Sequence, residues 1–105
     1  MTDAVVILCN CAGREQALEI GNRLIEERLA GCVNVLAPVE SVYRWKGKLE
    51  TEQEVPLIVK TTQQLFPAVR DRITELHSYD TPEIIALPVV AGSDKYLSWL
   101  RAQIS

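Results

Sequence analysis

Residues 41–61, with the sequence SVYRWKGKLETEQEVPLIVKT, are predicted to form the far end of an unusually long β-hairpin. With Lys46-Gly47-Lys48 as a three-residue loop, Trp45 faces Leu49 and Arg44 faces Glu50. Apolar side chains then meet each other and opposite charges pair, as cross-strand packing favours. A two-residue loop at Gly47-Lys48 would instead pair Trp45 with Glu50, because a slip of one residue exchanges the two faces.

The same register extends to the base of the hairpin. It pairs Val39 with Val55, Ala37 with Leu57, Leu36 with Ile58 and Val35 with Val59. Pro38 and Pro56 then fall opposite each other, and since neither has an N–H to donate, the ladder should break or kink there. Glu50, Glu52 and Glu54 alternate onto one face, where they either attract cations or form a solvated face that blocks aggregation.

The length of the hairpin predicts a tip that projects from the domain. Residues 33–45 span roughly 40 Å as an extended strand, whereas a compact domain of this size has a radius of gyration of only ~13 Å. In the predicted register Tyr43, Trp45 and Leu49 lie on one face of the tip, where apolar surface is costly to leave in water. We therefore expect these three side chains to pack on another copy of the chain.

Three further elements are predicted around the hairpin, two before it and one after it. A nearly continuous apolar run indicates a buried strand over residues 4–11. Apolar residues at helical spacing indicate a helix over residues 14–30, with Gly31 as its stop. After the hairpin, Thr62 is a candidate cap for a second helix in which Pro67 must lie in the first turn.

The last third of the sequence completes the fold. We expect a strand over residues 83–91 that Pro88 interrupts, and a final helix with Ser93 as its N-cap. The predicted class is therefore α+β, a single ferredoxin-like β-α-β-β-α-β domain over residues 1–105 with an additional C-terminal helix. Helices cover one face of an antiparallel sheet, and the other face is left to water or to a partner.

Composition limits the classes of partner. The net charge is −3, and basic residues cluster only at the hairpin tip beside glutamates, so we expect no nucleic-acid partner. The run Ala4 to Cys9 is too short for a signal peptide or a membrane span, so we expect no membrane partner. The three cysteines lack zinc-ribbon spacing and are an odd number, which favours a reducing cytoplasm over a disulfide framework.

Several blocks of the sequence are similar to the CutA family of divalent-cation tolerance proteins. They are VVILC in the first strand, AGCVNV at residues 30–35, SVYRWKGKLE and EVPLIVKTT in the hairpin, HSYDTPE at residues 77–83 and YLSWL at residues 96–100. The resemblance implies a ferredoxin-like homotrimer with the architecture of PII signalling proteins. It also implies a link with copper and other divalent ions through Cys9 and His77, although Leu76 stands where some members carry a further histidine.

The residues themselves offer a small set of metal ligands. Cys9 and Cys11 lie two apart on a strand, so their thiols share one face, and His77 is the single histidine. Thiolate and imidazole suit copper or zinc, and Glu83 adds a carboxylate. The alternative is structural: cysteines in an apolar strand are often small core residues, and a histidine at a helix end often interacts only with the helix dipole. Cys32 is expected in the core at the base of the hairpin.

Two functions remain open from the sequence. The first is a trimeric protein that binds divalent metal ions, with copper as the candidate ion and no cofactor required for folding. The second is a PII-like signalling or scaffolding trimer that binds a small ligand or a protein in the clefts between subunits. The sequence contains no P-loop, nucleophile elbow or HExxH motif, so we do not expect an enzyme.

Overall fold

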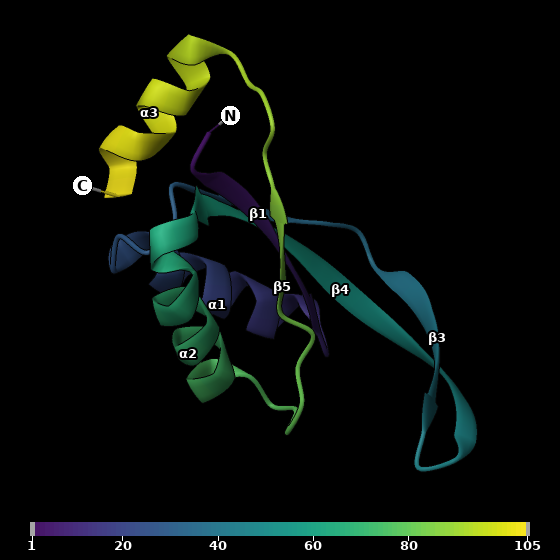
Figure 1. Cartoon of the computed structure of the whole chain (residues 1–105). Helices are drawn as coiled ribbons and strands as arrows, with labels where there is room; N and C mark the ends of the chain where they lie inside the picture. The colour runs from purple at the N-terminus through teal and green to yellow at the C-terminus, as the bar shows by residue number, and fades with distance from the viewer. Residues whose placement is uncertain (1, 105) are drawn as a thin grey trace.

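The computed structural model describes residues 2–104 as a sheet packed against helices (Figure 1). In chain order the elements are β1 (Ala4–Cys11), α1 (Arg14–Glu26), β2 (Cys32–Val35), β3 (Val39–Trp45), β4 (Lys48–Thr62), the 3-10 helix η1 (Gln63–Leu65), α2 (Phe66–Leu76), β5 (Ile85–Pro88) and α3 (Asp94–Ile104). The main strands follow the order β2-β4-β1-β5, all antiparallel, and β3 extends the hairpin on β4. This confirms the predicted α+β class and the extra C-terminal helix.

The core lies between one face of the sheet and helices α1 and α2 (Figure 1). On β1 and β4 the buried residues pair across the ladder, Ile7 with Val59, Cys9 with Leu57 and Cys11 with Val55. The helices fill the space above them with Ala17, Ile20, Leu24, Val69 and Ile73. On β5, Ile85 pairs with Leu8 and Leu87 pairs with Val6, on the face of the sheet opposite the core residue Ile7. Ile85 and Leu87 are 50% and 47% exposed, so this face keeps apolar surface in water.

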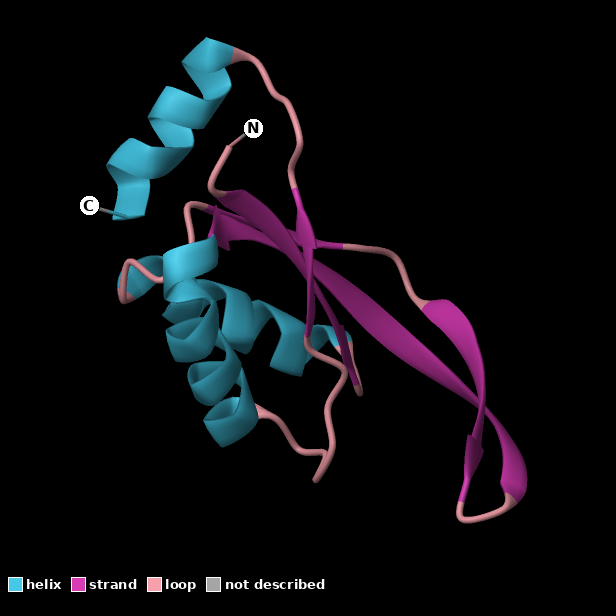
Figure 2. Cartoon of the chain, in the orientation of Figure 1, coloured by secondary structure: helices cyan, strands magenta, loops and turns pink. Residues whose placement is uncertain are grey.

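The hairpin projects as the sequence predicts. The molecule measures 45 Å along its long axis but only 26 and 24 Å along the other two, and its radius of gyration is 14.3 Å. Figure 2 shows β3 and the adjoining half of β4 extending well beyond the helices. Trp45 and Leu49, near the tip, are 50% and 71% exposed.

The predicted register of the tip is wrong by one residue. The loop contains two residues, Lys46 with φ 50° and Gly47 with φ 81°, and it pairs Trp45 with Lys48. Positive φ at both positions defines a type I′ turn, whose twist matches that of the flanking strands, so backbone geometry outweighs the better side-chain pairs of the three-residue loop. The slip also separates the three predicted interface residues: Leu49 faces Arg44, while Trp45 and Tyr43 share the other face.

The base of the hairpin shows where its ladder breaks. The predicted register at the base is wrong by two residues, because Val35 pairs with Leu57 and not with Val59. The N–H of Leu36 donates to the carbonyl of Pro56 at 3.0 Å. The chain then leaves the ladder at residues 36–38 and resumes with Val39 opposite Glu54. The break at Pro38 is confirmed, but Pro56 lies inside β4 rather than opposite Pro38. One extra residue is taken up on the β2–β3 side, as in a β-bulge.

Helix α1 ends four residues earlier than predicted, because Arg28 and not Gly31 takes the left-handed conformation, with φ 57°. The N–H of Leu29 then donates to the carbonyl of Leu24 at 2.9 Å. Gly31 has a different role. A Cβ there would lie 2.5 Å from Cδ1 of Leu100, so glycine lets α3 pack closely against this loop.

The later elements agree with prediction in part. Thr62 precedes η1 and makes no side-chain cap hydrogen bond, and α2 begins only at Phe66, so the predicted cap of the second helix is wrong. Pro67 lies in the first turn of α2, and the hydroxyl of Ser93 accepts a hydrogen bond from the N–H of Tyr96 at 3.1 Å, which confirms the cap of α3. The last strand is shorter than predicted, since β5 ends at Pro88. Each helix within residues 2–104 is too short or too polar to span a membrane.

Candidate metal centre

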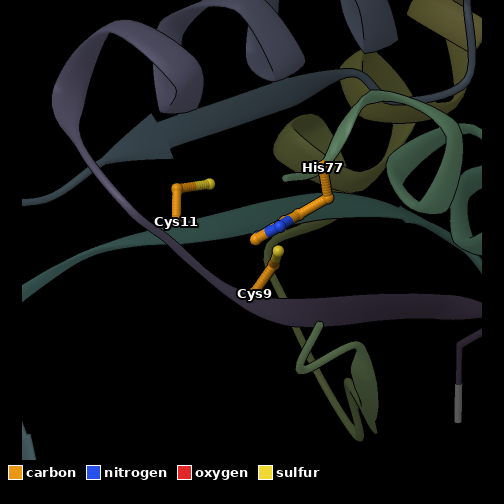
Figure 3. Close-up of side chains that lie close together, drawn as sticks. All are labelled: Cys9, Cys11 and His77. Carbon is orange, nitrogen blue, oxygen red and sulfur yellow. The ribbon is translucent and has the colours of Figure 1, made fainter. Parts of the chain in front are cut away.

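Three potential metal ligands meet in the core, on the face of the sheet that helices α1 and α2 cover. Cys9 and Cys11 point from β1 into the core, where both are fully buried. His77 directly follows α2, and its N–H donates to the carbonyl of Ile73 at 2.8 Å, which brings the imidazole under β1. Figure 3 shows the three side chains pointing toward one another, and their ligand atoms all lie within 4.8 Å of one another.

Both nitrogens of His77 are engaged. Nδ1 accepts a hydrogen bond from the N–H of Tyr79 at 3.0 Å, so the proton lies on Nε2, which donates to the carbonyl of Asn10 at 2.7 Å. The ring therefore ties the end of β1 to the segment after α2. A metal ion that binds His77 must replace one of these two hydrogen bonds.

The two thiols influence each other. Interaction with the Cys11 side chain raises the pKa of Cys9, and burial raises it further. The same interaction lowers the pKa of Cys11. The first proton that the pair loses is therefore that of Cys11, while Cys9 keeps its proton.

A buried carboxylate lies next to this cluster. Glu54 is only 7% exposed, and its Oε2 accepts a hydrogen bond from the hydroxyl of Tyr79 at 3.0 Å. The sequence predicted that Glu54 would share a face with Glu50 and Glu52 that is either solvated or attracts cations. Because Glu54 is buried, the prediction of a solvated face is wrong for this residue. Burial, and then the hydrogen bond to Glu54, raise the pKa of Tyr79. The ring of Tyr79 also lies 4.6 Å from that of His77, so the two rings support each other's position.

Glu83 lies outside the cluster of Cys9, Cys11 and His77. Its side chain is exposed, and its Oε1 accepts a hydrogen bond from Nδ2 of Asn10 at 3.4 Å. It borders an open cleft of about 460 Å³ whose lining includes Asn10, Tyr43, Trp45, Glu54 and Tyr79. The carboxylate is near enough to contribute to the raised pKa of Cys9, but it is not grouped with the three ligand atoms.

The donor set suits a thiophilic metal ion. Ligand atoms bound tetrahedrally to one metal at ~2.3 Å lie about 3.8 Å apart. The present separations, all within 4.8 Å, must therefore contract by up to about 1 Å when a metal ion binds. Two sulfurs and one imidazole favour copper or zinc over magnesium or calcium, which prefer oxygen ligands.

The sequence predicted Cys9 and His77 as ligands and favoured a core role for Cys11. Cys11 shares the face of Cys9, and this spacing was the signal for its inclusion, although it fits a core cysteine as well. The main-chain carbonyl of Asn10 had no signal, because every residue carries one. Tyr79 and Glu54 come together only through the fold, 25 positions apart in the chain.

The predicted interface residues lie away from the cluster, on the hairpin. Tyr43 is 36% exposed and Trp45 50% exposed on one face of the tip, and Leu49 is 71% exposed on the other. All three are accessible for contact with another chain. The structure contains a single chain, so their role in assembly stays a prediction.

Comparison with known proteins gives consistent matches. The family model described as CutA1 divalent ion tolerance protein matches residues 5–103. The divalent-cation tolerance protein CutA of Thermus thermophilus is 46% identical over 96 residues, which are 91% of this chain and 93% of the relative. Protein CutA, chloroplastic, of Arabidopsis thaliana is 42% identical over 93% of this chain, but the chain spans only 54% of that relative.

Solved structures agree with the sequence matches. The divalent cation tolerance protein of Thermus thermophilus superposes with a TM-score of 0.94 at 43% identity, over 97% of this chain and 99% of the other. CutA of Xylella fastidiosa superposes with a TM-score of 0.96 at 39% identity, over 99% of this chain and 100% of the other. The likeness therefore covers the projecting hairpin as well as the domain.

Proposed function

Because the chain belongs to the CutA1 divalent ion tolerance family, we propose that it binds copper at Cys9 and His77 and acts as a homotrimer in the response to divalent metal ions. The observation that carries the metal proposal is the approach of a thiol from β1 and an imidazole from the end of α2. These two residues are 68 positions apart in the sequence, and the fold places their ligand atoms within 4.8 Å. Glu83 acts through Asn10, which it hydrogen-bonds, rather than as a direct ligand.

Copper titration of three variants tests this proposal. Under anaerobic conditions, calorimetry should detect one high-affinity copper ion per chain in the parent, with weaker binding in His77→Ala and in Cys9→Ser. Protons compete for both ligands, so the affinity of the parent should also fall as the pH is lowered. Cys32→Ser is the matched control, because Cys32 is a free cysteine on β2 outside the cluster. Copper binding that survives both cluster substitutions would mean that the ion binds elsewhere.

Two apolar surfaces support the homotrimer. One is the tip of the hairpin with Tyr43, Trp45 and Leu49, and the other is the outer face of the sheet, where Ile85 and Leu87 are about half exposed. Burying such a side chain fully contributes about 1.5–3 kcal/mol. A second and a third copy of the chain would cover these surfaces without a change in the fold.

The cleft favours a second candidate function, a PII-like trimer that binds a small ligand or a protein. Tyr43, Trp45 and Tyr79 give it aromatic walls, and Glu54 and Glu83 give it carboxylates. Titration with ATP and a panel of cationic metabolites tests this function. Saturable heat that Trp45→Ala abolishes, in a protein that binds no copper, would place the signalling function first.

We also propose that the protein acts by binding rather than catalysis, and in the cytoplasm. The support for the compartment is the chemistry of Cys9, Cys11 and Cys32, which are all free thiols. Fractionation of cells with an antibody against the chain tests the location. Screening with generic hydrolase and transferase substrates tests the absence of catalysis.

A further inference from the structure

We propose that Cys11 is a third ligand at this site, so that two thiolates and the imidazole of His77 bind a thiophilic divalent ion such as Zn²⁺. This inference rests on the proposed function and extends it. It assigns a residue beyond the Cys9 and His77 pair and names the class of ion that the completed site selects.

The first argument is geometric. Cys9 and Cys11 project from the same face of β1, because residues two apart on a strand point the same way. Their sulfur atoms and a ring nitrogen of His77 form a group in which each pair of atoms lies within 4.8 Å. Within residues 2–104, Cys9, Cys11 and His77 are the Cys, His, Asp or Glu residues that bring three or more potential ligand atoms this close together. A single metal ion can therefore bind all three ligands after the group contracts by up to about 1 Å.

The second argument concerns charge. Cys9 and Cys11 are fully buried and His77 is 8% exposed, so a net charge left at the site would be costly. A divalent ion with two thiolates and a neutral imidazole has no net charge. On binding, each thiol releases its proton to solvent and the sulfur lone pair forms the bond to the metal. No electron transfer is required.

The third argument concerns selectivity. Magnesium and calcium prefer oxygen ligands, and magnesium keeps several of its waters. The cluster offers sulfur and nitrogen, and its side chains are packed among Val55, Leu57 and Ile73 in the hydrophobic core. Zinc, with typical Zn–S distances of about 2.3 Å, fits such ligands. The site should therefore discriminate strongly against hard ions.

Binding has a structural consequence at His77. The ring must exchange either the hydrogen bond from Nε2 to Asn10 or the one that Nδ1 accepts from Tyr79. The end of β1 and the segment after α2 are joined through these two contacts. A metal ion would replace one contact with a bond to the strand through the cysteine sulfurs, so the two segments remain connected.

The test counts sulfur atoms on the bound ion. Zinc X-ray absorption of the loaded parent should give two sulfur neighbours per zinc, a measurement that requires no substitution in the core. With Co²⁺ as an anaerobic probe, thiolate-to-cobalt absorption per ion should be halved in Cys11→Ala and lost in the Cys9→Ala/Cys11→Ala double variant. Zinc affinity of Cys11→Ala, measured against a chelating dye, should fall roughly a hundredfold or more, since even outer-shell partners of ligands give 10–100-fold.

The controls separate this inference from the proposed function. Cys32→Ala should match the parent in every measurement. If Cys11→Ala matches the parent and zinc has one sulfur neighbour, the assignment of Cys11 is wrong while copper binding at Cys9 and His77 stands. If the parent binds none of copper, zinc or cobalt, both the assignment and the proposed function are wrong. Equal affinity for Mg²⁺ and Zn²⁺ would also overturn the inference.

Discussion

At the scale of single residues, the contact between Tyr79 and Glu54 shows how the fold holds a carboxylate in a largely apolar setting. The hydroxyl of Tyr79 donates to Oε2 of Glu54 at 3.0 Å, and the glutamate is 7% exposed. A buried acceptor that loses its donor costs about 1–3 kcal/mol. The contact also fixes the segment that carries His77, so it stabilises the site as well as the fold.

Tyr79→Phe should therefore destabilise the protein by about 1–3 kcal/mol at neutral pH. Burial and the Glu54 hydrogen bond raise the folded pKa of Tyr79, so as the pH rises through the unfolded value of about 10, the unfolded chain loses the proton first and parent stability falls. The variant has no hydroxyl to titrate at position 79 and lacks this loss. The difference in unfolding free energy between parent and variant, measured by urea unfolding, should therefore become smaller between pH 8 and 11. Tyr96→Phe, an exposed tyrosine of α3, is the control. A deficit that stays constant with pH would contradict the assignment.

The site could be predicted from single residues only in part. A histidine and a cysteine have chemistry that is visible in the sequence, so Cys9 and His77 were candidates at once. The sequence favoured a core residue over a ligand at Cys11, and it is the position of His77 that supports the ligand role. The contact with the Asn10 carbonyl could not be predicted, because it depends on how the end of α2 meets β1.

At the scale of elements, periodicity predicted the strands and helices well, and turn geometry decided what periodicity could not. The bounds of β1 agree with the prediction to the residue. The hairpin register does not, because side-chain pairing was weighed without the left-handed backbone of Lys46 and Gly47. Arg28 shows the same limit at the end of α1, where a non-glycine residue takes positive φ. Such positions depend on local backbone energies that residue type only biases.

Gly47→Ala tests the turn. With φ 81° and open space around its Cα, the glycine is needed for conformation and not for packing, so alanine should cost about 1–2 kcal/mol. The loss should appear as faster hydrogen exchange of the amides around residues 43–51. Gly13→Ala is a matched control, since Gly13 also has open space but an extended backbone with φ −163°. Equal effects of the two substitutions would show that the turn does not depend on the left-handed conformation.

At the scale of the whole molecule, the projecting hairpin exposes large apolar side chains beyond the body of the domain. The tip extends along a 45 Å axis, beyond a body about 25 Å across. Val42 and Leu49 are 66% and 71% exposed on one face, and Trp45 is 50% exposed on the other. The corrected register therefore places apolar side chains on both faces of the tip, so a partner that covers one face alone would leave the other in water.

Trp45→Ala should weaken assembly of the proposed homotrimer by about 2 kcal/mol or more, because aromatic side chains at the centre of an interface dominate its binding energy. Light scattering of the parent at micromolar concentration should give three times the chain mass of 11.8 kDa, and the variant should show a lower, concentration-dependent mass. Lys48→Ala is the control on the same face, since Lys48 pairs with Trp45 but carries little apolar surface. Leu49→Ala examines the other face, and a loss of mass there as well would show that the neighbouring chains enclose the hairpin. A parent that scatters as a monomer would contradict the homotrimer, and an unchanged Trp45→Ala trimer would place this side chain in solvent.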